Sequence, residues 1–242
     1  MKKLPRAGEL MWVMGIVIVA FGIALCDKAD LGVSMIAAPA FIVNEAVSAY
    51  LPGLTVGMTE YIIQGLLLAL MCIIIGRFRL RYLLAFGVSV IYGSVLDLFL
   101  WLLSGVTLDA VWLRWVMLIL GDAVTAFGVA CFFRTYLPLQ VYELFVAEFA
   151  ARYKLAVNNV KWGFDLSMLA ISIVLALSLF GDAAAFDWSS IGYASFHSIG
   201  LGTLVTAAIN SPIIRVLGNL IDRIFDTSPR FPNLKAALLR KG

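Results

Sequence analysis

The stretch FGIALCDKADLGVSMIAAPAFIVNE, at residues 21–45, joins an apolar run to a charged break and then to a second apolar run. The first run extends back to about residue 10. A helix that spans the hydrocarbon core of a membrane needs about 20 mostly apolar residues. The stretch therefore predicts a first transmembrane helix over about 10–27, ended by the charged break.

The composition predicts a membrane protein rather than a soluble one. Of the 242 residues, 62% are hydrophobic and 14% are charged, with a mean hydropathy of +0.99. A soluble domain carries about 25% charged and 45–50% apolar residues. The surplus apolar surface makes the lipid bilayer the expected partner. No long polar linker interrupts the chain, so we expect one membrane domain over residues 1–242.

The apolar runs predict the fold class. We expect an all-α polytopic helix bundle, because only helices and closed barrels satisfy their backbone groups in lipid. Six runs are long enough to span the membrane: 10–27, 56–76, 82–104, 111–133, 162–181 and 195–221.

The basic residues predict the orientation. With six spans, all of the 18 Lys and Arg residues except Lys28 and Arg114 fall on the side of the N-terminus. Lys and Arg are enriched in cytoplasmic loops. We therefore expect both termini in the cytoplasm, with a basic C-terminal tail over 222–242.

Two further segments, 33–50 and 138–153, are helical in pattern but ambiguous. If both crossed the membrane, the basic residues at 77–81 would move to the outer side, against the charge rule. We interpret the two segments as re-entrant or interfacial helices. Irregular backbone at membrane depth is tolerated only where protein or a wet cavity surrounds it.

The two halves of the chain resemble each other. FGIA at 21–24 matches FGVA at 127–130, and each is followed by a polar break and one ambiguous segment. The spans that open with TVGMTEYIIQ and NVKWGFDLSM carry Glu60 and Asp165 at equivalent places. We predict a repeat of about 10–104 in about 111–221. Because each half has three spans, the second half would insert in the opposite direction, as in many secondary transporters.

Four carboxylates fall inside predicted spans and are candidate substrate- or ion-binding residues: Asp122, Asp165, Glu60 and Asp97. An ionised side chain at mid-membrane costs about 2.5–3.5 kcal/mol, so such residues commonly mark a pathway or a structural pair. Each has a structural alternative, although no basic residue lies within one turn of Asp122 in sequence. Asp165 follows Lys161 by four residues and fits a local ion pair, Glu60 fits a helix start at the water interface, and Asp97 fits a buried hydrogen bond.

The polar breaks supply three more candidates. Asp30 lies in the break after the first span, while Thr203 and Asn210 lie in the polar last span, IGLGTLVTAAINSP. Broken helices offer free backbone groups to a polar ligand at the membrane centre. An ordinary outer loop and helix-packing contacts are the alternatives.

Several classes of function lack a motif. The net charge of +3 does not indicate nucleic acid, and three scattered Cys with one His do not indicate a metal site. The nucleophile, zinc-protease and phosphate-loop motifs are all missing from the sequence. We expect no cofactor and no enzymatic activity.

Most of the chain resembles the YczE-like bacterial membrane proteins, which are related to the YitT-like group. The resemblance lies in a G-x-A-L…A-D-L-G run followed by a T-x-G turn, carried here by Gly22, Ala24, Leu25, Ala29, Asp30, Leu31, Gly32, Thr55 and Gly57. It implies a bacterial inner-membrane location and does not specify a substrate.

The repeat and the intramembrane acids together predict a secondary transporter of a small polar or cationic solute, coupled to protons or another cation. The alternative is a non-transporting membrane protein that assists or regulates a partner, since the tail SPRFPNLKAALLRKG is basic. The solute, the coupling ion and a homo-oligomeric state are left open.

Overall fold

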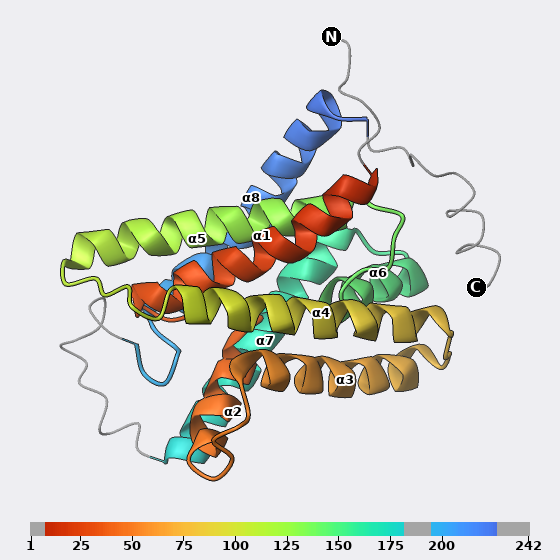
Figure 1. Cartoon of the computed structure of the whole chain (residues 1–242). Helices are drawn as coiled ribbons and strands as arrows, with labels where there is room; N and C mark the ends of the chain where they lie inside the picture. Colours follow the sequence, from red (N-terminus) through yellow and green to blue (C-terminus); the bar gives the residue numbers. More distant parts are fainter. Residues whose placement is uncertain (1–7, 182–194, 227–242) are drawn as a thin grey trace.

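The computed structural model describes residues 8–181 and 195–226, and every regular element in these ranges is a helix (Figure 1). The basic N-terminal residues 2–6, the acidic segment 182–190 and tail residues 227–242 lie outside the described residues. The eight helices are α1 Gly8–Ala29, α2 Ala38–Ser48, α3 Val56–Ile75, α4 Arg81–Leu102, α5 Val111–Phe132, α6 Val141–Tyr153, α7 Val157–Phe180 and α8 Leu201–Ile224.

Six of these helices, all except α2 and α6, are long and apolar enough to cross a membrane. The predicted all-α polytopic bundle is confirmed. Two predicted boundaries were wrong. The helix of the fifth predicted span, α7, begins at Val157 rather than 162, because a polar first turn precedes its apolar run. The last begins at Leu201 rather than 195, since Gly200 before it is fully extended, and it continues to Ile224 through Pro212.

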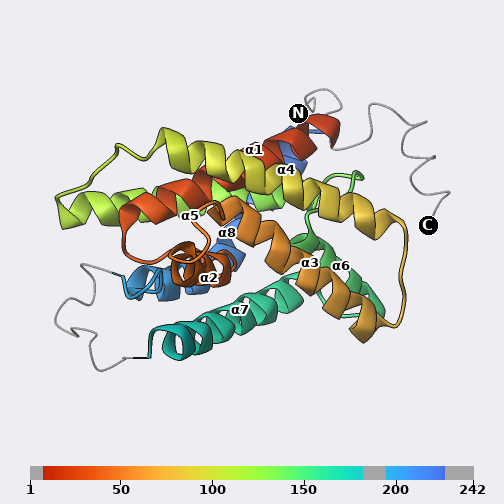
Figure 2. The same ribbon diagram turned by 60° about the horizontal axis from the view of Figure 1, so that its bottom comes forward.

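The short helices α2 and α6 each begin inside the molecule and end at its surface. In α2, residues 38–42 are buried, whereas Glu45 and Ser48 are exposed. In α6, residues 141–143 are buried and residues 151–153 are exposed. Figure 2 shows the two helices apart from each other, with α2 in the left half of the view and α6 beside α3 in the right half. This gradient along each helix is the one that a re-entrant segment requires.

The packing of α1 against α5 is the most extensive of the contacts between helices, and the two helices run in opposite directions (Figure 1). Gly22 permits this approach, because a Cβ atom there would lie 2.7 Å from the carbonyl oxygen of Gly121. At Gly128 a Cβ atom would lie 2.9 Å from the backbone nitrogen of Val19. Small residues at helix crossings allow such approach in membranes.

Helix contacts follow a paired pattern. α1 packs on α4 as α5 packs on α8, and α2 packs on α7 as α6 packs on α3. Likewise, α3 contacts α4 and α7 contacts α8. If α1, α2, α3 and α4 are exchanged for α5, α6, α7 and α8, respectively, this same set of helix pairs results.

Candidate functional site: a buried acidic cluster

The described residues bury more carboxyl groups than cations. Four acids, Glu60, Asp122, Glu143 and Asp165, have at most 3% of their surface exposed, and Lys161 is the buried cation among the described residues. They come from α3, α5, α6 and α7, so the fold gathers them from both halves of the chain. Burying an unpaired charge costs several kcal/mol, so this arrangement needs compensation.

Two polar residues of α8 connect α5 to α7. Asn210 donates from Nδ2 to Asp122 Oδ1 at 2.7 Å, and Ser211 lies 3.3 Å from Asp165 Oδ2. The other oxygen of Asp165 pairs with Lys161, one turn earlier in α7. Asp122 Oδ2 and Asn210 Oδ1 are buried without a hydrogen-bond partner. These five residues form what we call the central cluster.

The expected local ion pair between Lys161 and Asp165 is confirmed, whereas the role of Asp165 in binding stays a prediction. The charge of Lys161 also acts on Asp122 of α5 and Glu143 of α6. One cation thus faces three carboxyl groups. The central cluster can accept further positive charge, whether a proton or a cationic group.

Glu60 lies in a second group next to this cluster. Its Oε2 accepts hydrogen bonds from Tyr142 Oη at 2.9 Å and from Gln64 Nε2 at 3.4 Å. Its Oε1 is buried with no partner. The interpretation of Glu60 as a residue at the water interface was wrong, because α4 and α6 cover this face of α3 and leave the side chain 0% exposed.

Sequence reasoning missed Glu143 as a site residue. It lies in the first turn of α6, and burial raises the pKa of Glu143 to about 7. The signal was available, because an acid follows directly after an apolar segment at the start of a short helix. The first turn of that helix is buried rather than exposed, and only the packing of α6 against α3 and α7 determines this.

Asp97 lies outside the buried acidic groups described above. We predicted it deep in a span, but it is partly exposed near the end of α4. Its Oδ1 accepts from the backbone N–H of Gly57 at 2.7 Å and its Oδ2 from Thr55 Oγ1 at 2.6 Å. A carboxylate at a helix N-terminus is stabilised by the free N–H groups there. Asp97 therefore fixes the start of α3 by hydrogen bonds, as its structural alternative expected, but it is partly exposed rather than buried.

Asp30 and Thr203 lie at the junction of the two polar breaks. Asp30, exposed and at φ +52°, accepts from Arg114 at 3.2 Å and Ser195 at 3.0 Å. Thr203 is buried and accepts from the backbone N–H of Gly200. A hydrogen bond joins the two breaks: the backbone N–H of Gly202 donates to the carbonyl oxygen of Leu31 at 2.9 Å. These contacts make the junction a structural element separate from the central cluster.

A groove of about 420 Å³ leads toward the central cluster. Its lining includes Ser211, the residue beside Asp165, and Trp162, the neighbour of Lys161 in sequence. The other lining residues are Asn158, Asn159, Pro212, Arg215, Val216 and Asn219, and most of the surface that the groove presents is apolar. Ser211 thus lies between the groove and Asp165.

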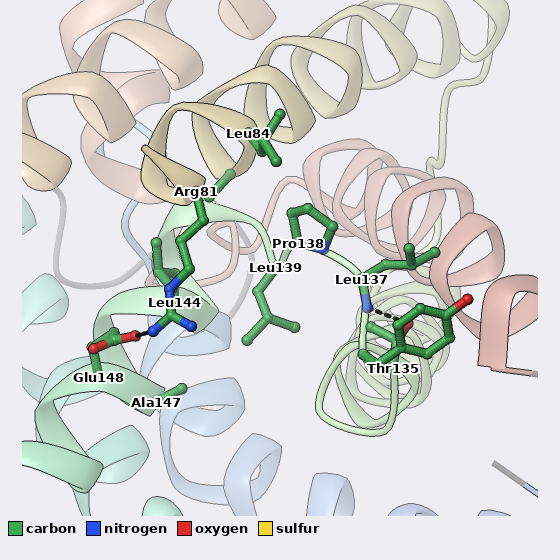
Figure 3. A pocket seen from close by; sticks show the side chains of 11 residues that line it. Arg81, Leu84, Thr135, Leu137, Pro138, Leu139, Leu144, Ala147 and Glu148 are labelled. Atoms are coloured by element: carbon green, nitrogen blue, oxygen red, sulfur yellow. Dashed lines mark hydrogen bonds and ion pairs between the residues drawn. The ribbon is translucent and has the colours of Figure 1, made fainter. Parts of the chain in front are cut away.

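A second cavity, of about 240 Å³, lies between α4, α6 and the segment that joins α5 to α6 (Figure 3). Arg81 and Glu148 meet across it at 2.5 Å, and Arg79 approaches the same carboxylate at 3.6 Å. This cavity has none of the four buried acids in its lining. The ion pairs fasten the outer half of α6 to the start of α4.

A family model for DUF6198, a family of unknown function, matches residues 7–219. The chain belongs to this family. The match covers all of the described helices except the last residues of α8. No curated protein and no solved structure matches the chain. For this DUF6198 member, a proposal about function therefore depends on the geometry of the site and on general physical chemistry.

Proposed function

We propose that this DUF6198 protein is a secondary transporter of a small polar or cationic solute, and that the solute binds at the central cluster. The excess of four buried carboxyl groups over one buried lysine, among the described residues, carries this proposal. A binding site built this way is completed by positive charge, because unpaired buried carboxylates are costly. Intramembrane acids commonly mark such pathways.

The groove beside Ser211 supplies the approach to this site. It is large enough for a small solute, because a pocket for a small ligand has about 300–1,000 Å³. Asn and Ser groups give hydrogen bonds along the route, and the indole of Trp162 gives a flat apolar surface. The solute would pass Ser211 to reach Asp165 and Asp122.

An inverted repeat would explain how the site opens to each side in turn. Its support is the opposite direction of α1 and α5 and the exchange of helix contacts between the two halves. In such transporters one repeat moves against the other around a central site. Labelling of single cysteines tests the topology: a thiol at 51–55 and one at 77–81 should react from opposite sides of the membrane. Reaction from the same side would refute the repeat.

Cell location follows from the resemblance and the charges. Six candidate spans make this a multi-pass membrane protein. We propose the bacterial cytoplasmic membrane, with both termini inside, because Arg77, Arg79 and Arg81 cluster in the turn between α3 and α4. The YczE-like resemblance gives the same location.

Ligand-induced thermal stabilisation, measured with a panel of small organic cations and neutral polar solutes, tests the function. A compound that binds the folded state raises the melting temperature. We expect at least one compound to stabilise the wild type and Asp97→Asn but not Asp122→Asn, and to enter proteoliposomes. Stabilisation of all three proteins alike would remove the central cluster from the mechanism. If no compound binds and a stoichiometric membrane partner is isolated instead, the partner-assisting alternative is correct.

A further inference from the structure

The side chain of Glu60 is the end point of a chain of hydrogen bonds, in which Ser89 Oγ also lies 3.2 Å from the carbonyl oxygen of Ala85. The backbone N–H of Val141 lies 3.3 Å from Ser89 Oγ, and Ser89 Oγ lies 2.5 Å from Gln64 Oε1. Because Gln64 accepts at its oxygen, its amide N–H₂ faces Glu60. Tyr142 supplies a second donor. All the partners of Glu60 therefore donate to one oxygen, Oε2.

Its surroundings contain no positive charge to balance an ionised carboxylate. The helices packed on α3 are α2, α4 and α6. The titratable groups that face Glu60 from α4 and α6 are Tyr92, Tyr142 and Glu143, all neutral or acidic. From α2, the neutral Asn44 contacts the neighbouring Thr59. Lys161, the buried cation among the described residues, pairs with Asp165 instead.

The energies favour the neutral acid. A hydrogen bond to a charged group contributes about 1.5–3 kcal/mol. The two neutral donors on Oε2 therefore stabilise the anion, but they do not offset several kcal/mol of desolvation per buried ion. In addition, Oε1 has no donor at all. At a buried position without a hydrogen-bond partner, the hydroxyl of a neutral carboxylic acid costs less free energy than the charged oxygen of a carboxylate.

A metal cation does not fit the same place. The amide N–H₂ of Gln64 is turned toward the carboxyl group, and a donor does not ligate a cation. The described residues also hold no group of three His, Cys, Asp or Glu side chains arranged for a metal ion. A proton needs only the free Oε1.

We propose that Glu60 is a proton-binding site, separate from the central cluster, which carries a proton at neutral pH while α4 and α6 cover it. Glu143 lies next to Tyr142 in α6 and acts electrostatically on Glu60, and Lys161 acts on Glu143. Release of the proton from Glu60 therefore changes the charge balance of the central cluster. This coupling role rests on the proposed transport function, whereas the protonation itself does not.

Infrared spectroscopy of the purified full-length protein in lipid vesicles at neutral pH tests the proposal without any solute. A protonated carboxyl group has a carbonyl stretch that the carboxylate lacks. The difference spectrum between wild type and Glu60→Gln should show the loss of one such band, and Asp97→Asn should retain it. Tyr142→Phe should keep the band and shift its frequency, because it removes one hydrogen bond to the group.

Folding of each variant is checked by melting temperature and gel filtration. A folded Glu60→Gln protein with all acid carbonyl bands of the wild type would overturn the proposal. If Glu60→Gln does not fold, an unshifted spectrum of Tyr142→Phe overturns it equally. Failure of every solute in the transport assay, with the band present and assigned to Glu60, would refute the transporter but leave the proton site standing.

Discussion

Gly22→Ala at the crossing of α1 and α5 should destabilise the protein by about 2–3 kcal/mol, the upper range for overpacking in a close-packed core. The added Cβ would lie 2.6 Å from the backbone nitrogen of Thr125 and 2.7 Å from the carbonyl oxygen of Gly121. Ordinary van der Waals contact begins at 3.4 Å. Since both neighbours are backbone atoms, the helices must separate by roughly 0.8 Å, a gap that forfeits a quarter to a half of each contact energy.

Two matched alanine variants calibrate this prediction. A Cβ at Gly128 meets the Val19 backbone nitrogen at 2.9 Å, so Gly128→Ala should destabilise the protein less than Gly22→Ala. A Cβ at Gly163 of α7 meets nothing within 4 Å. Gly163→Ala should therefore be neutral or stabilising by up to about 1 kcal/mol, since Ala is the better helix former.

Thermal unfolding in detergent, followed by the loss of the monodisperse gel-filtration peak, measures the order of the three variants. We expect melting temperatures that fall from Gly163→Ala to Gly128→Ala to Gly22→Ala. A Gly22→Ala protein as stable as Gly163→Ala would show that the two helices do not approach this closely.

Three further changes probe the buried polar groups. Lys161→Met should lower stability by about 3–5 kcal/mol because Asp165 loses its counter-charge, and Asp165→Leu in the same chain should restore most of the lost melting temperature. Asn210→Leu should lower stability by about 1–3 kcal/mol, because Asp122 keeps its burial and loses its donor; equal melting temperatures would contradict the bond. Burial raises the pKa of Glu143 from 4.5 to about 7, so at pH values between these two the folded state binds more protons at Glu143 than the unfolded state does. Stability should therefore fall as the pH rises through this range. Glu143→Gln should flatten this dependence of stability on pH, and an unchanged dependence would assign it to other groups.

The long helices were predictable because their signal is local. Length and apolar content alone place α3 and α5 within a residue or so of their observed ends. The acids in these helices were recognisable for the same reason, since any carboxyl group in an apolar run is conspicuous. Asp122 and Asp165 are both fully buried and both contact α8.

What each acid contacts was not predictable, because the contacts depend on how helices cross. Asp97 and Glu60 gave the same local signal, but Asp97 reaches the start of α3 whereas Glu60 faces α4 and α6. Glu143 was overlooked because periodicity within a short helix does not show which end of it is buried. Gln64, polar but uncharged, gave no signal beyond one amide in an apolar run.

The two halves of the proposed repeat share an arrangement but not a chemistry. Glu60 in α3 and Asp165 in α7 are both fully buried carboxyl groups near the starts of equivalent helices. Four residues before Asp165 the chain has Lys161, but four residues before Glu60 it has Val56. A lysine at this spacing can pair with the acid within the same helix, and Asp165 has that partner. Glu60 lacks that partner among the described residues, and this difference is the reason that we propose Glu60 as the proton site and the central cluster as the solute site.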